Sequence, residues 1–126
     1  MQILRRLVLI PFAAATIVLG FTIPAQASIR PTAYYELFNS DSWFGVTVNT
    51  NPENYGVQAE LKCVSGGGQL SYYYGDWVYS PGAVSTAISN CTGGGGYPAA
   101  GYLRWRKSDP MRVTCWIPGD SRAGTC

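Results

Sequence analysis

Five large aromatic side chains lie close together in residues 71–79, which read Ser-Tyr-Tyr-Tyr-Gly-Asp-Trp-Val-Tyr. Glycine at the first central position favours a type II′ turn, so we expect a β-hairpin that reverses at Gly75-Asp76. Alternate residues of paired strands share a face. The hairpin would therefore place four rings on one side: Tyr72, Tyr74, Trp77 and Tyr79. Exposed rings of this kind suit stacking on sugars or anchoring a protein interface, whereas buried ones would form part of the core.

A second group with binding chemistry is the basic run at residues 104–107, Arg-Trp-Arg-Lys. On a strand, three side chains here would share a face: Tyr102, Arg104 and Arg106. Two guanidinium groups so placed could clamp a carboxylate or a phosphate, and the tyrosine ring offers a cation–π contact. The alternative is a solvated strand face whose charges offset Glu60 or Asp76.

The residue types argue against catalysis. Histidine is absent from the sequence, which removes the Ser-His-Asp triad, the Cys-His pair and the imidazole general base. The four cysteines show no CxxC spacing, which argues against a metal site. We expect a protein that is not an enzyme and that holds neither a metal nor a cofactor. A weak glycoside hydrolase that uses two carboxylates, for example Glu36 or Glu60 with Asp76, ranks last among the alternatives.

Four cysteines in a short secreted domain imply two structural disulfides. We expect Cys63–Cys91 and Cys115–Cys126, because each pair joins neighbouring segments and the second ties down the chain end; two other pairings remain open. Closing these loops contributes roughly 3.6 and 2.8 kcal/mol on the chain-entropy model. The disulfides would thus supply a large part of the stability of so small a domain.

The N-terminus predicts export. A positive pair, Arg5-Arg6, precedes an apolar run over residues 7–23 and an Ala-Gln-Ala cleavage site that ends at Ala27. This order is typical of a secretory signal peptide over residues 1–27. The alternative, a membrane anchor, is disfavoured because the run is short and contains a proline. We expect residues 28–126 to form one secreted, extracellular, monomeric domain with no stable membrane anchoring after cleavage.

Charge is balanced in the predicted mature part but unevenly distributed. Residues 28–126 contain seven Lys and Arg against seven Asp and Glu, which argues against nucleic acid held by bulk charge. Two basic and five acidic residues give residues 28–99 a charge of −3, while five basic and two acidic residues give 100–126 a charge of +3. The two parts either meet and offset each other or leave a functional basic patch.

Apolar periodicity predicts strands throughout this domain. The expected strands cover residues 33–38, 43–49, 57–63, 83–89, 102–106 and 111–117, separated by turns rich in Gly, Pro and Asn. In residues 57–63 the odd positions are apolar or Cys and the even ones polar. In the last strand Met111, Val113, Cys115 and Ile117 alternate with Arg112, Thr114 and Trp116. We therefore predict an all-β fold, a small antiparallel β-sandwich or barrel-like domain with two disulfides.

This format is similar to that of small secreted two-disulfide inhibitors, namely the proteinaceous α-amylase inhibitors and the crystallin-like metalloprotease inhibitors. Residues 105–107, Trp-Arg-Lys, match the inhibitory Trp-Arg-Tyr triplet of the amylase inhibitors at two of three positions. Because the third residue and the cysteine spacing differ, no functional residue is carried over. We expect a secreted, non-catalytic binding protein that acts on an extracellular protein, as an enzyme inhibitor or an antagonistic polypeptide. The alternative is a module that binds carbohydrate or cell wall through its aromatic face. A flat, exposed aromatic row would favour sugar.

Overall fold

The computed structural model describes residues 29–38, 40–120 and 123–126. The predicted signal peptide and its cleavage site lie outside these residues. Within them, no helix has both the length and the apolar character needed to cross a bilayer.

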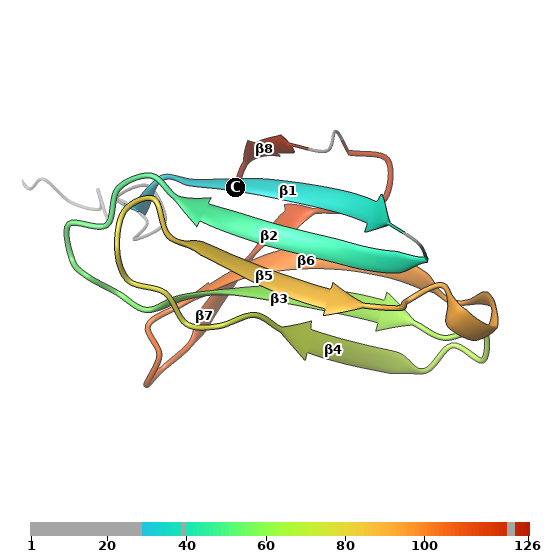
Figure 1. The fold of residues 1–126 in the computed structure, drawn as a ribbon. Helices are drawn as coiled ribbons and strands as arrows, with labels where there is room; N and C mark the ends of the chain where they lie inside the picture. The colour runs from blue at the N-terminus through green and yellow to red at the C-terminus, as the bar shows by residue number, and fades with distance from the viewer. Residues whose placement is uncertain (1–28, 39, 121–122) are drawn as a thin grey trace, which may run out of the picture.

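The described residues form two antiparallel four-stranded sheets packed face to face (Figure 1). We call β5-β2-β1-β8 the first sheet and β4-β3-β6-β7 the second sheet. The strands are β1 Pro31–Phe38, β2 Asp41–Val48, β3 Val57–Val64, β4 Leu70–Tyr74, β5 Val84–Ser89, β6 Tyr97–Trp105, β7 Met111–Trp116 and β8 Ala123–Thr125, with a short 3₁₀ turn, η1, at Gly93–Gly95. The predicted all-β fold is confirmed, as a sandwich of two separate sheets.

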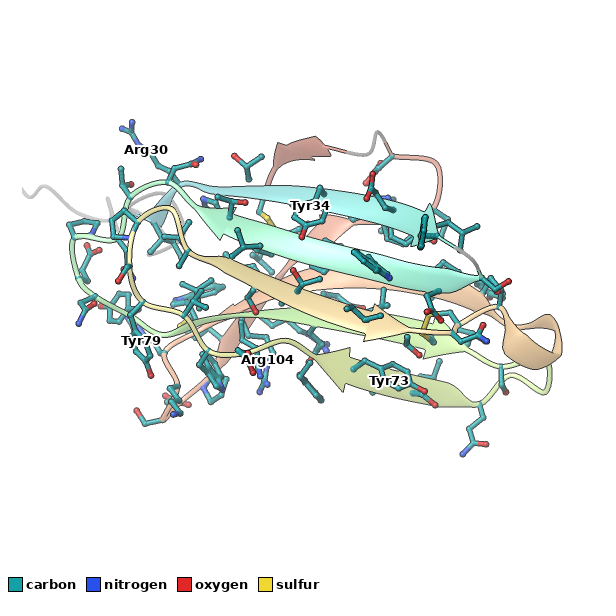
Figure 2. All side chains as sticks on the ribbon, viewed as in Figure 1. Arg30, Tyr34, Tyr73, Tyr79 and Arg104 are labelled. Atoms are coloured by element: carbon teal, nitrogen blue, oxygen red, sulfur yellow. A yellow bond between two sulfur atoms is a disulfide. The ribbon has the colours of Figure 1, made fainter. Side chains whose placement is uncertain are left out.

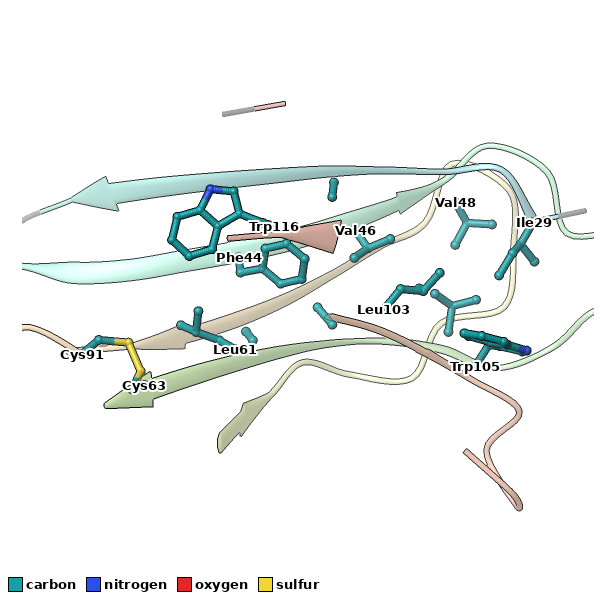
Figure 3. Packing of buried hydrophobic residues seen from close by; sticks show 14 residues of the cluster. Ile29, Phe44, Val46, Val48, Leu61, Cys63, Cys91, Leu103, Trp105 and Trp116 are labelled. Atoms are coloured by element: carbon teal, nitrogen blue, oxygen red, sulfur yellow. A yellow bond between two sulfur atoms is a disulfide. The ribbon is translucent and has the colours of Figure 1, made fainter. Parts of the chain in front are cut away.

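The core lies between the sheets and follows the period-2 pattern of the sequence (Figure 3). Strand β3 alternates as predicted, and its inward side chains are buried: Val57, Ala59, Leu61 and Cys63. Strands β2 and β6 supply the rest of the central packing through Phe44, Val46, Val48, Leu103 and Trp105. The even positions of β3 therefore face outward, and this placement builds the site described below.

A β-bulge overturns the predicted alternation at the end of β7. Gly101 pairs with Trp116, but the next residue of β6, Tyr102, pairs with Thr114, so Cys115 is an extra residue in the register. The bulge turns Trp116 into the core, where its ring stacks on Tyr35 at a centroid distance of 4.0 Å. Ile117, predicted to share the apolar side, is instead half exposed.

The predicted hairpin at Gly75-Asp76 is wrong. The backbone does not reverse there but continues beside β3, since Tyr74 pairs with Glu60 and Val78 forms a further bridge with Val57. A Cβ atom at Gly75 would lie 2.5 Å from Ser85 Oγ and 2.7 Å from the backbone nitrogen of Thr86. The glycine is therefore required for a close approach to β5, which local sequence signals do not reveal.

Both predicted disulfides are confirmed. Cys63 of β3 is bonded to Cys91, which follows β5, and Cys115 of β7 is bonded to Cys126, which follows β8. Each bond thus joins the second sheet to the first. The pairing was predicted from nearness in the sequence, whereas in the fold both bonds hold the two layers together.

Candidate functional site

The outward side of the second sheet brings together five of the seven side chains predicted to bind. Tyr72 and Tyr74 come from β4, Tyr102 and Arg104 from β6, and Trp77 from the segment after β4. Tyr72 is 39% exposed and Tyr74 is 51% exposed. These two tyrosines therefore belong to the surface and not to the core. Figure 2 shows Arg104 on the lower side of the molecule, away from Tyr34 of the first sheet.

A buried carboxylate organises this surface. Glu60 occupies an outward position of β3, yet it is only 3% exposed because its neighbours cover it. Arg112 Nη1 donates a hydrogen bond to Glu60 Oε2 at 2.8 Å, and Arg104 Nε lies 3.6 Å from Glu60 Oε1. Arg104 also donates to Gln58 Oε1 at 2.7 Å. A buried carboxylate is stabilised when such charged donors surround it.

The two arginines in turn hold aromatic rings. Arg104 Cζ lies 5.0 Å from the ring centroid of Tyr74 and 5.7 Å from that of Trp77, and Arg112 Cζ lies 4.2 Å from that of Tyr102. These distances are typical of cation–π contacts. We call the seven residues gathered on this side of the second sheet the aromatic–arginine face: Glu60, Tyr72, Tyr74, Trp77, Tyr102, Arg104 and Arg112.

The surroundings in the face raise the pKa values of two of its members. Partial desolvation of the Tyr74 hydroxyl, reinforced by the nearby Glu60 carboxylate, raises its pKa above the ordinary value. The hydrogen bond to Glu60 raises the pKa of the Arg112 guanidinium. Both shifts reinforce the states that these groups already hold at neutral pH, a protonated tyrosine hydroxyl and a charged guanidinium.

Backbone contacts position the Trp77 ring on this face. Val78 and Val57 exchange two hydrogen bonds, of 2.9 and 2.8 Å. On the other side, the buried hydroxyl of Ser85 donates to the carbonyl of Asp76 at 2.6 Å and accepts from the amide of Ala59 at 2.9 Å. Because Trp77 lies between Asp76 and Val78, the loop that carries it is tied to both β3 and β5.

The other two predicted residues, Tyr79 and Arg106, lie elsewhere, in an adjoining hollow of about 690 Å³. We expected Arg106 to share a face with Arg104, but β6 ends at Trp105 and Arg106 adopts a left-handed backbone with φ of 63°. Its guanidinium instead lies 4.9 Å from the ring centroid of Tyr55. Tyr79 does not face Tyr72, because the hairpin that would pair them does not form.

Sequence reasoning missed the central role of Glu60 and the participation of Arg112. The sequence analysis did name Glu60 as one of two possible counter-charges for the basic strand face, and Glu60 contacts Arg104 in the structure. The opposite charges of residues 28–99 and 100–126 were a further signal, since Glu60 belongs to the first part and both arginines to the second. Only the pairing of β3 with β6 and of β6 with β7 brings them together.

The described residues hold no group of three or more His, Cys, Asp or Glu side chains placed to bind a metal ion. Of the carboxylates considered for glycoside hydrolysis, Glu60 is engaged by two arginines and Glu36 lies on β1 of the first sheet. Comparison of the sequence and the fold with protein-family models, curated proteins and solved structures found no match.

Proposed function

We propose that this protein is a secreted, non-catalytic binding protein that recognises an extracellular protein through the aromatic–arginine face. The main support for this proposal is the buried Glu60, which binds two arginines. These arginines in turn contact tyrosine and tryptophan rings at the surface. Two disulfides are consistent with an extracellular location. The partner is an enzyme that the protein inhibits or a surface protein of another cell that it antagonises.

The composition of the face favours a protein partner. Tyr, Trp and Arg are the residue types that most often dominate binding energy at protein interfaces. Here Tyr74, Trp77 and Tyr102 are held by contacts with arginines that Glu60 binds, so little of their side-chain freedom remains to be lost on binding. Arg104, Arg112 and Lys62 outnumber Glu60 among the charged outward positions, which suits a partner with a surplus of acidic groups.

Carbohydrate binding is the second candidate, favoured by the exposure of Tyr72 and Tyr74. A sugar ring stacks on the flat face of an aromatic side chain. In this protein, guanidinium groups lie against the rings of Tyr74 and Tyr102. A sugar would have to use the opposite ring faces or displace arginines that are bonded to Glu60, so we rank this function below protein binding.

The proposal is tested by capture experiments on the protein expressed from the full-length sequence. It is immobilised and exposed separately to a panel of purified secreted hydrolases and to cellulose, chitin and peptidoglycan. The test variant is Tyr72→Ala with Tyr74→Ala. The matched control is Phe38→Ala with Ile88→Ala, which removes two exposed apolar side chains from the first sheet.

Capture or inhibition of a hydrolase that is lost in the test variant and kept in the control supports protein binding through this face. Retention on a polysaccharide that is lost in the test variant moves carbohydrate binding to first place. Binding that is lost only in the control places the functional surface on the first sheet and overturns the proposal. Near-ultraviolet circular dichroism verifies that every variant keeps its fold.

A further inference from the structure

The hollow beside the aromatic–arginine face has the features of an anchor pocket. Two tyrosines, Tyr55 and Tyr79, line it together with three charged residues that follow β6: Arg106, Lys107 and Asp109. It adjoins the face, since a Cβ atom at Gly56 would lie 3.0 Å from Trp77 Cε3 and 3.2 Å from Tyr79 Cε1. A partner that covers the face therefore reaches the hollow as well.

One buried side chain fixes both tyrosine walls. Asn51 is 7% exposed, and its Nδ2 donates to the carbonyl oxygens of Tyr55 and Tyr79, each at 2.8 Å. Its Oδ1 accepts from the amide of Tyr55 at 3.1 Å. On the opposite rim, the amide of Arg106 donates to the carbonyl of Gly56 at 3.0 Å. Hydrogen bonds to the backbone therefore hold both rims of the hollow in place, and its shape does not depend on exposed side chains alone.

The cations of this hollow differ from those of the face. Arg104 and Arg112 each form an ion pair with Glu60. Within the described part of the protein, neither Arg106 nor Lys107 forms an ion pair. Arg106 stacks on Tyr55 and donates one hydrogen bond, from Nη2 to the Tyr55 hydroxyl at 3.3 Å. Both residues line the hollow, and the other N–H groups of Arg106 and the Lys107 ammonium are donors that an anion could use.

We infer that this hollow binds a carboxylate group carried by the protein partner, with the aliphatic part of the same residue packed between Tyr55 and Tyr79. This inference rests on the proposed function and adds which residue of the partner is anchored in the hollow. Asp109 offsets one of the two cations, so the lining carries a net charge of +1, which suits a carboxylate monoanion better than a phosphate dianion. A planar guanidinium beside an ammonium matches the two oxygens of a carboxylate.

A carboxylate on a protein is either an Asp or Glu side chain or the free C-terminus of the polypeptide, and short peptides distinguish the two. The probes are acetyl-Ala-Ala-Glu-amide, acetyl-Ala-Ala-Leu with a free carboxylate, and the neutral acetyl-Ala-Ala-Gln-amide. Trigalacturonic acid serves as a carboxylated sugar. Each is titrated into the ¹⁵N-labelled protein, and amide shifts at residues 54–56, 79 and 106–109 are followed by NMR at low and high salt.

We expect one or both charged peptides to shift these amides, with an affinity that falls at high salt, while the neutral peptide has no effect. Arg106→Gln and, separately, Lys107→Gln should each weaken binding about tenfold. Arg30→Gln, which removes an exposed arginine just before β1, should leave it unchanged. Shifts by the side-chain carboxylate or by the free terminus alone identify the source of the group.

Three results would overturn the inference. These are equal binding of the neutral peptide, no shift with any carboxylate peptide, or binding of trigalacturonic acid alone. Its failure is separable from that of the proposed function. If a hydrolase is captured in a manner that depends on Tyr72 and Tyr74 but not on Arg106 and Lys107, only the anchor pocket is wrong.

Discussion

Aromatic residues on the two outer faces of the sandwich make different kinds of contact. On the first sheet, strands β1, β2 and β5 contain no Lys or Arg, and Phe38 lies 6.0 Å from Trp43, centroid to centroid. The Tyr34 ring covers Gly45, and the Tyr34 hydroxyl bonds to Thr86 Oγ1 at 2.9 Å. On the second sheet, the rings of Tyr74 and Tyr102 instead contact arginines held by a buried carboxylate.

This difference shows how one strand pattern can give two kinds of surface. Both sheets alternate inward apolar side chains with outward ones, so the pattern alone does not tell the faces apart. A glycine in β2 lets the tyrosine of the first sheet lie flat and satisfy its hydroxyl internally. A glutamate in β3 of the second sheet draws in charged groups and keeps tyrosine rings at the surface. The surplus of positive charge beside exposed tyrosine rings is the reason why we propose the second face for recognition.

The largest effect expected from this comparison concerns the two glutamates. Glu60→Gln removes the buried counter-charge of two arginines and should lower the free energy of unfolding by about 2.5 kcal/mol. This loss is smaller than that expected for a fully buried ion pair, because both arginines reach solvent. Glu36→Gln, at an exposed position of the first sheet, should change it by less than about 0.5 kcal/mol. Urea denaturation measures both. Equal effects would show that Glu60 does not organise its face.

A second test compares one glycine from each sheet. A Cβ atom at Gly101 would overlap the buried ring of Phe44, and one at Gly45 would overlap the Tyr34 ring, which can swing toward solvent. We expect Gly101→Ala to cost about 2 kcal/mol by overpacking. Gly45→Ala should cost about 1 kcal/mol, roughly the value of the lost hydrogen bond to Thr86. Thermal denaturation distinguishes them, and a larger loss for Gly45→Ala would contradict the packing described.

The smallest effect is a pH dependence at Tyr74. Because its pKa is raised in the folded protein from the ordinary 10.0, the unfolded state loses this proton first as the pH rises. The contribution of Tyr74 to stability is therefore complete below pH 10 and is lost as the pH rises through the folded-state pKa. The melting temperature of Tyr74→Phe should fall less steeply above pH 10 than that of the parent. Tyr72→Phe controls for loss of a tyrosine hydroxyl, and an unchanged slope in Tyr74→Phe would count against the environment assigned to this residue.

The features predicted correctly from the sequence are those with a local signal. Alternation in residues 57–63 identified β3 with its inward and outward sides, and an even number of cysteines in a small domain indicated two disulfides. Strand alternation also placed Tyr72 with Tyr74 and Tyr102 with Arg104, but only the pairing of β3 with β4 and β6 puts the two groups on one surface. These properties depend on neighbouring residues and on the side-chain period of a strand.

The wrong predictions concern residues whose position depends on contacts with a distant part of the sequence. Gly75 was interpreted as a turn residue, but its lack of a side chain serves contact with β5. Trp116 was placed on the polar side because the bulge at Cys115 arises from pairing with β6. Arg106 left its expected face because β6 ends one residue earlier. Strand register and strand ends depend on tertiary pairing, which a single sequence does not encode locally.

The most direct test of the central claim is amide hydrogen exchange on the protein expressed from the full-length sequence, with and without a bound partner from the capture panel. We predict that the bound partner slows exchange in β4, in residues 75–79 and at the end of β6 through residue 109, and leaves β1, β2 and β5 unchanged. Protection confined to β1, β2 and β5 would contradict this prediction, because the partner would then lie on the outer face of the first sheet.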